Sequence, residues 1–163
     1  MHEHSSFLRL PQWHVAALPM TFHRALFIDF DGVLHRAGDG IEDVGPHWVW
    51  LPLLAKALEL APDLPVVVHS TWRYQYHPSE LRELLSPLGS RLIDVAPRGP
   101  RQEAIRWWLH MHPTVTSYRV LDDDGKEFDE PHPEELLLCE PSLGLTTPGV
   151  LERLVEWLEK STS

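Results

Sequence analysis

Three short stretches of this sequence end an apolar run with side chains that can do chemistry. Asp29 and Asp31 end the run in LFIDFDG, Ser70 ends the run in VVVHST, and Asp122 and Asp123 end the run in YRVLDDD. A buried strand that ends in two carboxylates brings like charges together, which costs free energy unless a cation offsets them. The pattern therefore predicts a cation beside these carboxylates.

The expected cation is Mg²⁺, because hard oxygen ligands suit it. Proteins bind Mg²⁺ through one or two carboxylates, several waters and the phosphate oxygens of a substrate. We expect its ligands among four carboxylates: Asp29, Asp31, Asp122 and Asp123. The ion would offset their repulsion and let the site accept an anionic phosphate.

The Asp-x-Asp spacing predicts two different roles for its carboxylates. Asp29 is the expected nucleophile, which attacks phosphorus and forms an aspartyl-phosphate, so that hydrolysis proceeds in two easier steps. Asp31 is the expected general acid and base, a role that requires a pKa raised by its neighbours. Gly32 allows the chain to leave the strand in a tight turn.

Two further side chains complete the predicted phosphate site. Ser70 is expected to donate a hydrogen bond to a phosphoryl oxygen from the end of the next strand. A basic side chain is needed to stabilise the charge of the transferring group. Arg101 is the first candidate for this role, and Arg98 and Arg73 are the alternatives.

The chain alternates β-type runs with segments of helical period, which indicates an α/β domain. We expect a Rossmann-like three-layer sandwich around a parallel sheet of about five strands, with the third and fifth strands at its edges. Ligands bind at the carboxyl ends of such strands, where the strand order switches direction. The expected strands are Ala25–Phe30, Pro65–His69, Leu92–Val95, Tyr118–Asp122 and Leu136–Cys139.

Proline residues mark the expected helix starts, since the first helical turn does not need the N–H that proline lacks. Thr147 is the expected N-cap of the last helix. Tryptophan side chains at positions 72, 107, 108 and 157 are expected to pack in the core or on helix faces. The expected helices are Leu51–Ala61, Pro78–Ser86, Pro100–His110 and Pro148–Lys160.

Composition limits the classes of partner. The chain has 14 basic and 24 acidic residues, a net charge of −10, so nucleic acid is a possible partner that the charge does not favour. Its single cysteine, Cys139, is expected to be an inert buried thiol in a reducing, cytoplasmic setting. No apolar run approaches the roughly 20 residues of a membrane-spanning helix, so no membrane partner is expected.

The chain is expected to form one domain. Residues 1–22 are taken as an N-terminal extension without a clear structural pattern, and residues 23–163 as the domain. The segment HRAGDGIEDVG after the first strand is either a flap over the strand end or a plain surface loop.

Taken in order, these motifs resemble the haloacid dehalogenase (HAD) superfamily of aspartate-nucleophile phosphohydrolases. The resemblance rests on LFIDFDGVL, VVVHSTWR, RQEAIRWWL and YRVLDDD, and it covers roughly residues 25–160. The STWR, DDD and EPSLGLT segments look like small HAD domains of bacterial and phage proteins, some of them attached to RNA-repair enzymes. The resemblance implies Asp29 as nucleophile, Asp31 as acid and base, Ser70 and Arg101 as phosphate ligands, and Asp122 with Asp123 as the acidic pair. Arginine stands where the family usually has lysine.

The resemblance also implies a domain without a cap, because the gaps between motifs hold only a helix, loops and a strand. An open site suits either a phosphorylated small molecule or the exposed phosphate end of a macromolecule. The expected activity is Mg²⁺-dependent hydrolysis of a phosphomonoester. The alternative is a non-catalytic phosphate-binding module or a receiver-like phosphoacceptor domain.

Overall fold

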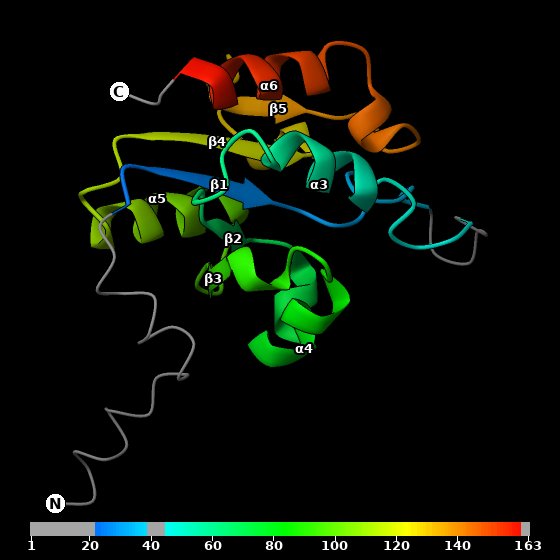
Figure 1. The fold of residues 1–163 in the computed structure, drawn as a ribbon. Coiled ribbons are helices and arrows are strands. Elements are labelled where there is room, and N and C mark those ends of the chain that lie inside the picture. The colour runs from blue at the N-terminus through cyan, green and yellow to red at the C-terminus, as the bar shows by residue number, and fades with distance from the viewer. Residues whose placement is uncertain (1–21, 39–44, 161–163) are drawn as a thin grey trace, which may run out of the picture.

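A computed structural model of the chain describes residues 22–38 and 45–160. Within these ranges the chain forms five strands and four α-helices in a layered α/β arrangement (Figure 1). The predicted extension at residues 1–22 lies outside the described residues except for Phe22, and so does most of the predicted flap. The strands are β1 (Arg24–Ile28), β2 (Val66–Val68), β3 (Leu92–Val95), β4 (Ser117–Asp122) and β5 (Leu136–Leu138).

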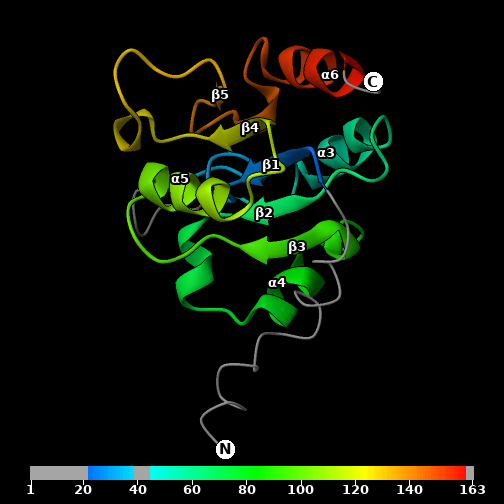
Figure 2. The same cartoon turned by 90° about the vertical axis from the view of Figure 1, so that its left-hand side faces the viewer.

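All five strands belong to one parallel sheet with the order β3-β2-β1-β4-β5 (Figure 2). The predicted Rossmann-like sheet and the predicted edge positions of β3 and β5 are confirmed. The chain runs from β1 outward to β3 and then returns across the sheet to β4. The strand order therefore switches between β1 and β4, and a ligand site is expected at their carboxyl ends.

The two faces of the sheet bury two separate sets of apolar side chains. Successive residues of β1 point to opposite faces, so Phe27 belongs to one core cluster and Leu26 and Ile28 to the other. Helix α5 (Arg101–Met111) covers the first face, and Figure 2 shows it on the side opposite α3 (Leu51–Leu58) and α6 (Val150–Lys160). Helix α4 (Pro78–Leu84) contributes Leu81 to the second core. This is the predicted three-layer sandwich.

The helices differ from the predicted ones at their ends. Helix α3 ends at Leu58, and the guanidinium of Arg91 donates to the carbonyl oxygens of Leu58 and Ala61, at 2.6 and 2.7 Å. Helix α6 begins at Val150 instead of Pro148. The predicted cap, Thr147, uses its hydroxyl differently: it accepts from the N–H of Glu140 and donates to the carbonyl of Gly144.

The tryptophans follow the packing prediction with one exception. Trp108 and Trp157 are 3% and 4% exposed, whereas Trp107 is 54% exposed. Neighbouring helical residues point about 100° apart, so α5 can turn only one of the Trp107–Trp108 pair toward the sheet. Cys139 is buried as predicted, and burial raises the pKa of its thiol.

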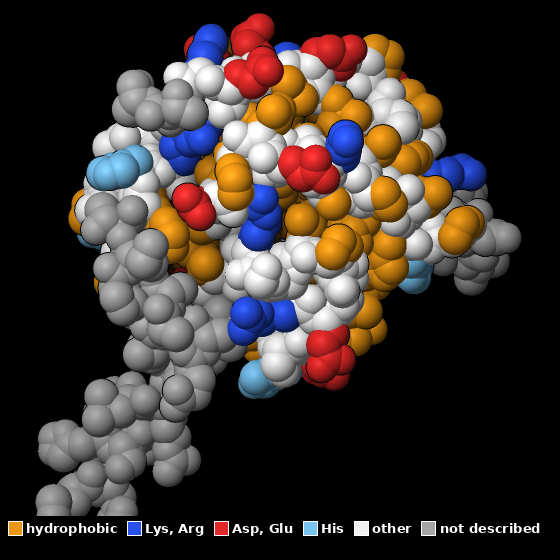
Figure 3. All heavy atoms as spheres, in the orientation of Figure 1, with side chains coloured by type: hydrophobic (Ala, Val, Ile, Leu, Met, Phe, Trp, Pro, Cys, Tyr) orange, Lys and Arg blue, Asp and Glu red, His pale blue; other side chains and the backbone are white. Residues whose placement is uncertain are grey.

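The outer face over α3 and α6 carries acidic, basic and hydrophobic side chains intermixed (Figure 3). No single charge dominates that face. In the part of the chain that the structure describes, no helix is both long and apolar enough to cross a membrane.

Candidate active site

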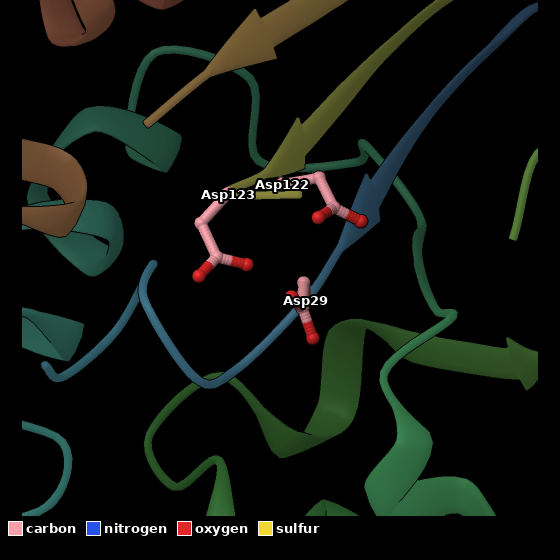
Figure 4. Close-up of side chains that lie close together, drawn as sticks. All are labelled: Asp29, Asp122 and Asp123. Carbon is pink, nitrogen blue, oxygen red and sulfur yellow. The ribbon is translucent and has the colours of Figure 1, made fainter. Parts of the chain in front are cut away.

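Three carboxylates meet where β1 and β4 end. Asp29 directly follows β1, Asp122 is the last residue of β4, and Asp123 comes next. The two strands are hydrogen-bonded neighbours, and the N–H of Asp29 extends their pairing by donating to the carbonyl of Leu121 at 3.0 Å. One oxygen from each carboxylate lies within 4.8 Å of the others, and Figure 4 shows the three side chains around one common space.

A glycine makes room for this cluster. Gly32 lies in the turn after β1 with a φ of +77°, in the left-handed region that favours glycine. A Cβ atom at this position would overlap the carboxylate of Asp123. The glycine of the Asp-x-Asp-Gly motif thus serves both the turn and the placement of Asp123.

Burial makes ionisation of this cluster costly. Asp29 is 1% exposed, and burial, together with repulsion from Asp122, raises its pKa to about 7. The same two causes raise the pKa of Asp123 to about 6. Burial also opposes ionisation of Asp122, but a hydrogen bond with His69 and the charge of Arg101 outweigh it and lower the pKa of Asp122.

Arg101 supplies a positive charge inside the cluster. It is the first residue of α5, and its Nη1 lies 3.0 Å from Oδ2 of Asp29 and 2.7 Å from Oδ1 of Asp122. The distance from the same nitrogen to Oδ1 of Asp123 is 4.0 Å. The side chain is 16% exposed, so solvent screens these contacts only in part. The return of the chain through α5 therefore brings one guanidinium to all three carboxylates.

The two alternative basic residues are occupied elsewhere. Arg73 is buried and donates to the backbone carbonyl oxygens of His69, Ser70, Pro97 and Gly99. Arg98 lies over the ring of Tyr74, 4.8 Å from its centroid. Of the three arginines considered from the sequence, the described contacts place only Arg101 against the acidic cluster.

Ser70 lies at the end of β2, the strand on the other side of β1. It is fully buried, and its Oγ accepts a hydrogen bond from the backbone N–H of Trp72 at 3.2 Å. This bond starts the short 3₁₀ turn Thr71–Tyr74. A hydroxyl that accepts one hydrogen bond still has its own proton to donate.

Asp31 lies beside this cluster with its carboxylate held by two nitrogen atoms. Oδ1 is 2.8 Å from Nε2 of His35, and Oδ2 accepts from the indole N–H of Trp72 at 2.9 Å. The hydrogen bond with His35 is the largest effect on Asp31 and lowers its pKa, with Trp72 acting in the same direction. The raised pKa predicted from the sequence is therefore wrong for the unliganded protein, because the sequence did not show these partners.

His69 is a second buried histidine at the site. Its Nε2 lies 2.7 Å from Oδ2 of Asp122, and both side chains are fully buried. Its Nδ1 has no hydrogen-bond partner among the described residues. His69, which follows β2, therefore orients the carboxylate at the end of β4, although β1 lies between these two strands.

Three of the four carboxylates predicted as Mg²⁺ ligands lie together in the structure. Asp29, Asp122 and Asp123 offer three hard oxygen ligands within reach of one ion. Burial and repulsion from Asp122 raise the pKa values of Asp29 and Asp123, and a bound divalent cation would oppose both effects. The carboxylate of Asp31 is outside this group, since both of its oxygens bond to His35 and Trp72.

Sequence reasoning gave too little weight to His35, His69 and Trp72. Trp72 was expected only to pack, yet it joins Ser70 through its backbone and Asp31 through its indole. Neither histidine was assigned a role from the sequence. The available signal was their position, because His35, His69 and Trp72 lie within four residues of a predicted site residue.

Comparison with known proteins agrees with the fold and the acidic cluster, which together define a HAD-type α/β domain. Residues 25–150 match the family model described as the HAD domain in Swiss Army Knife RNA repair proteins. Because this match covers most of the 163 residues, the chain belongs to this family of the HAD superfamily of phosphohydrolases. The search of curated proteins and the search of solved structures each found no match.

Proposed function

We propose that this protein is a Mg²⁺-dependent phosphomonoester hydrolase that works through an aspartyl-phosphate on Asp29. The observation that carries the proposal is the group of three carboxylates and one guanidinium at the switch between β1 and β4. This group combines a nucleophile, ligands for a metal and a fixed positive charge. The family match supports the same class of chemistry.

Charge balance explains how an acidic protein admits a phosphate at this position. Ionised Asp29, Asp122 and Asp123 carry three negative charges, and Arg101 supplies one positive charge. A bound Mg²⁺ supplies the other two, polarises the phosphoryl group and lowers the cost of bringing an anion to Asp29. Arg101 and the hydroxyl of Ser70 then bind the remaining phosphoryl oxygens.

The first step transfers the phosphoryl group to the protein. An oxygen of Asp29 forms a bond to phosphorus while the bond from phosphorus to the leaving-group oxygen breaks. Asp31 donates a proton to the departing alkoxide, which leaves as an alcohol. Asp31 is ionised in the unliganded protein, and the negative charge of a bound phosphate favours its protonated form.

The second step returns the protein to its starting state. Asp31, now a carboxylate, takes a proton from a water molecule, and the oxygen of this water attacks phosphorus. The bond between phosphorus and Asp29 breaks, and inorganic phosphate leaves. The products are one alcohol and one phosphate for each ester and water consumed.

The proposed substrate is a phosphomonoester with an accessible phosphate. In the described ranges, the segment between β1 and β2 forms α3 and turns, and the segment between β2 and β3 forms α4 and 3₁₀ turns. The site therefore has no cap built from these residues. The family name refers to RNA repair, so the phosphate end of an RNA belongs among the test substrates together with small phosphate esters.

The deciding experiment measures phosphate release from a panel of esters with and without Mg²⁺. The panel contains p-nitrophenyl phosphate, sugar phosphates, nucleotides and RNA oligonucleotides with a 5′- or 3′-phosphate. We expect turnover that requires Mg²⁺ and that falls at least about 1,000-fold in Asp29→Asn, because amide oxygen is a poor nucleophile. The fold of this variant should persist, as judged by its thermal unfolding.

Asp129→Asn is the matched control, since Asp129 is exposed and its carboxylate pairs with Arg106 instead of joining the acidic cluster. It should keep full activity. Retained turnover in Asp29→Asn would contradict the nucleophile assignment. Phosphate binding without turnover on any ester would favour the non-catalytic alternative, and a long-lived phosphorylated Asp29 would favour the receiver-like one.

A further inference from the structure

Both oxygens of the Asp31 carboxylate have a fixed partner although the side chain lies at the surface. The Asp31 side chain is 48% exposed, which would ordinarily leave it free to change rotamer. Instead, Oδ1 lies 2.8 Å from Nε2 of His35 and Oδ2 lies 2.9 Å from Nε1 of Trp72. The two contacts hold opposite corners of one carboxylate and so define its position and its plane.

His35 is itself fixed in one orientation and one tautomer. Its ring is fully buried, and its Nδ1 accepts a hydrogen bond from the backbone N–H of Trp48 at 3.3 Å. A neutral imidazole has one donor and one acceptor nitrogen, so Nε2 carries the proton and donates a hydrogen bond to Oδ1 of Asp31. A buried polar ring costs free energy unless it is hydrogen-bonded, and here one of its two bonds goes to Asp31.

Trp72 is fixed by aromatic neighbours and by the phosphate-binding turn. Its ring packs against Phe30 and Tyr76, with centroids 5.5 and 5.3 Å away. Its backbone N–H donates to Oγ of Ser70 at 3.2 Å. One residue thus joins the proposed phosphate-binding hydroxyl to the proposed proton donor.

We propose that His35 and Trp72 are positioning residues that hold Asp31 at the leaving-group oxygen, and that this makes the site suited to phosphate esters of alcohols, whose leaving group needs a proton. This inference rests on the proposed function. Precise placement of an acid speeds the departure of a poor leaving group far more than that of a good one, which leaves without protonation. Acyl phosphates and activated aryl phosphates gain little from such a device.

The test compares two substrates of nearly the same shape, phenyl phosphate and p-nitrophenyl phosphate. Phenoxide is the poorer leaving group and needs the proton more. Trp72→Phe keeps a ring and removes the N–H donor. We expect it to lower kcat/KM, which reports the step in which the leaving group departs, about 10-fold more for phenyl phosphate than for p-nitrophenyl phosphate, and Asp31→Asn to show the same selectivity more strongly.

Substitutions of His35 give an independent test, which includes one replacement that keeps a hydrogen-bond donor. His35→Met removes the donor, whereas His35→Gln offers an amide N–H at similar reach. We expect His35→Met to show the selective loss and His35→Gln to recover at least part of it. Trp107→Phe is the matched tryptophan control, because Trp107 is 54% exposed on α5, and it should change neither rate.

A readout that does not depend on turnover is the indole N–H signal of Trp72 in an NMR spectrum of the full chain. In Asp31→Ala this signal should shift and its proton should exchange faster with solvent. An unchanged signal would overturn the inference. Equal losses of kcat/KM on both substrates in Trp72→Phe would also overturn it, and this result would count even if His35→Met failed to fold. If the wild-type chain hydrolyses no ester of the wider panel, the proposed function fails and this inference fails with it; if it hydrolyses both aryl esters without the selective loss, only this inference fails.

Discussion

At the scale of single residues, one guanidinium serves three carboxylates. Arg101 contacts Asp29 and Asp122 closely, while the two alternative arginines bond to backbone carbonyls or lie over a tyrosine ring. All of these contacts are made by one nitrogen, Nη1, so Arg101 acts here as a single positive charge, the part that lysine usually takes in the superfamily.

Replacing Arg101 by alanine should therefore harm catalysis more than any other arginine replacement at the site. We expect kcat/KM to fall about 100-fold or more in Arg101→Ala, because a buried charge that stabilises the transferring phosphoryl group is lost. Arg98→Ala is the matched control and should stay within about 3-fold of wild type. Steady-state kinetics on one ester checks both variants, and the reverse order would move the basic role to Arg98.

The acidic cluster should make stability depend on pH and on metal. The pKa of Asp29 is about 7 in the folded protein against an ordinary value of 3.8, so between these values the folded state binds more protons than the unfolded state. The stability that Asp29 contributes is complete below the lower value and is lost as the pH rises through the higher one. Asp123, with a pKa of about 6, acts in the same direction.

Mg²⁺ competes with these protons, so its stabilising effect should grow with pH. We expect the increase in Tm caused by Mg²⁺ to be small near about pH 5 and largest near about pH 8. Thermal unfolding with Mg²⁺ and with a chelator across this range measures the effect. In Asp29→Asn the pH dependence should flatten, and an effect of Mg²⁺ that is equal at all pH values would contradict this account.

At the scale of secondary-structure elements, the turn after β1 decides where the cluster can form. Gly32 has a positive φ, and its missing side chain leaves the space that Asp123 fills from the end of β4. The turn and the strand end are thus matched to each other, although 91 residues separate Gly32 from Asp123 along the chain. The register between β1 and β4 makes this contact possible.

Gly32→Ala should lower both stability and metal affinity. The substitution adds backbone strain of about 1 kcal/mol or more and pushes the carboxylate of Asp123 away. Gly149→Ala is the matched control, since Gly149 has a similar φ of +88° and nothing within 4 Å of an added Cβ. Both variants should lose stability in denaturant unfolding, but only Gly32→Ala should weaken the stabilisation by Mg²⁺. Equal weakening in both would show that the Asp123 contact does not matter.

At the scale of the whole molecule, the topology places the site. The chain builds β1, β2 and β3 in one direction and then crosses the sheet through α5, which begins at Arg101 and leads to β4. This single crossing brings the proposed nucleophile, the basic residue and the acidic pair together at the carboxyl ends of the strands. Helix α5 covers one face, the other three helices contribute to the core on the opposite face, and the carboxyl edge is left to the loops that carry the chemistry.

The sequence by itself determined the class of fold and most of the site. Strands that are buried on both faces appear in the sequence as apolar runs. Polar residues at the ends of these runs are therefore easy to recognise as candidates for a site. This reasoning found Asp29, Asp122 and Asp123 and placed β3 and β5 at the edges. Helix ends were predicted less well, because contacts such as those of Arg91 come from distant residues.

Only the tertiary structure decided which partners surround each charge. The pKa of Asp31 is lowered by His35 and Trp72, and these hydrogen bonds depend on how the turns after β1 and β2 approach each other. The choice of Arg101 over Arg98 and Arg73 likewise depends on the path of the chain into α5. A sequence states which groups are present, but the energy of a charge depends on distance and burial, which are set when the strands are packed side by side.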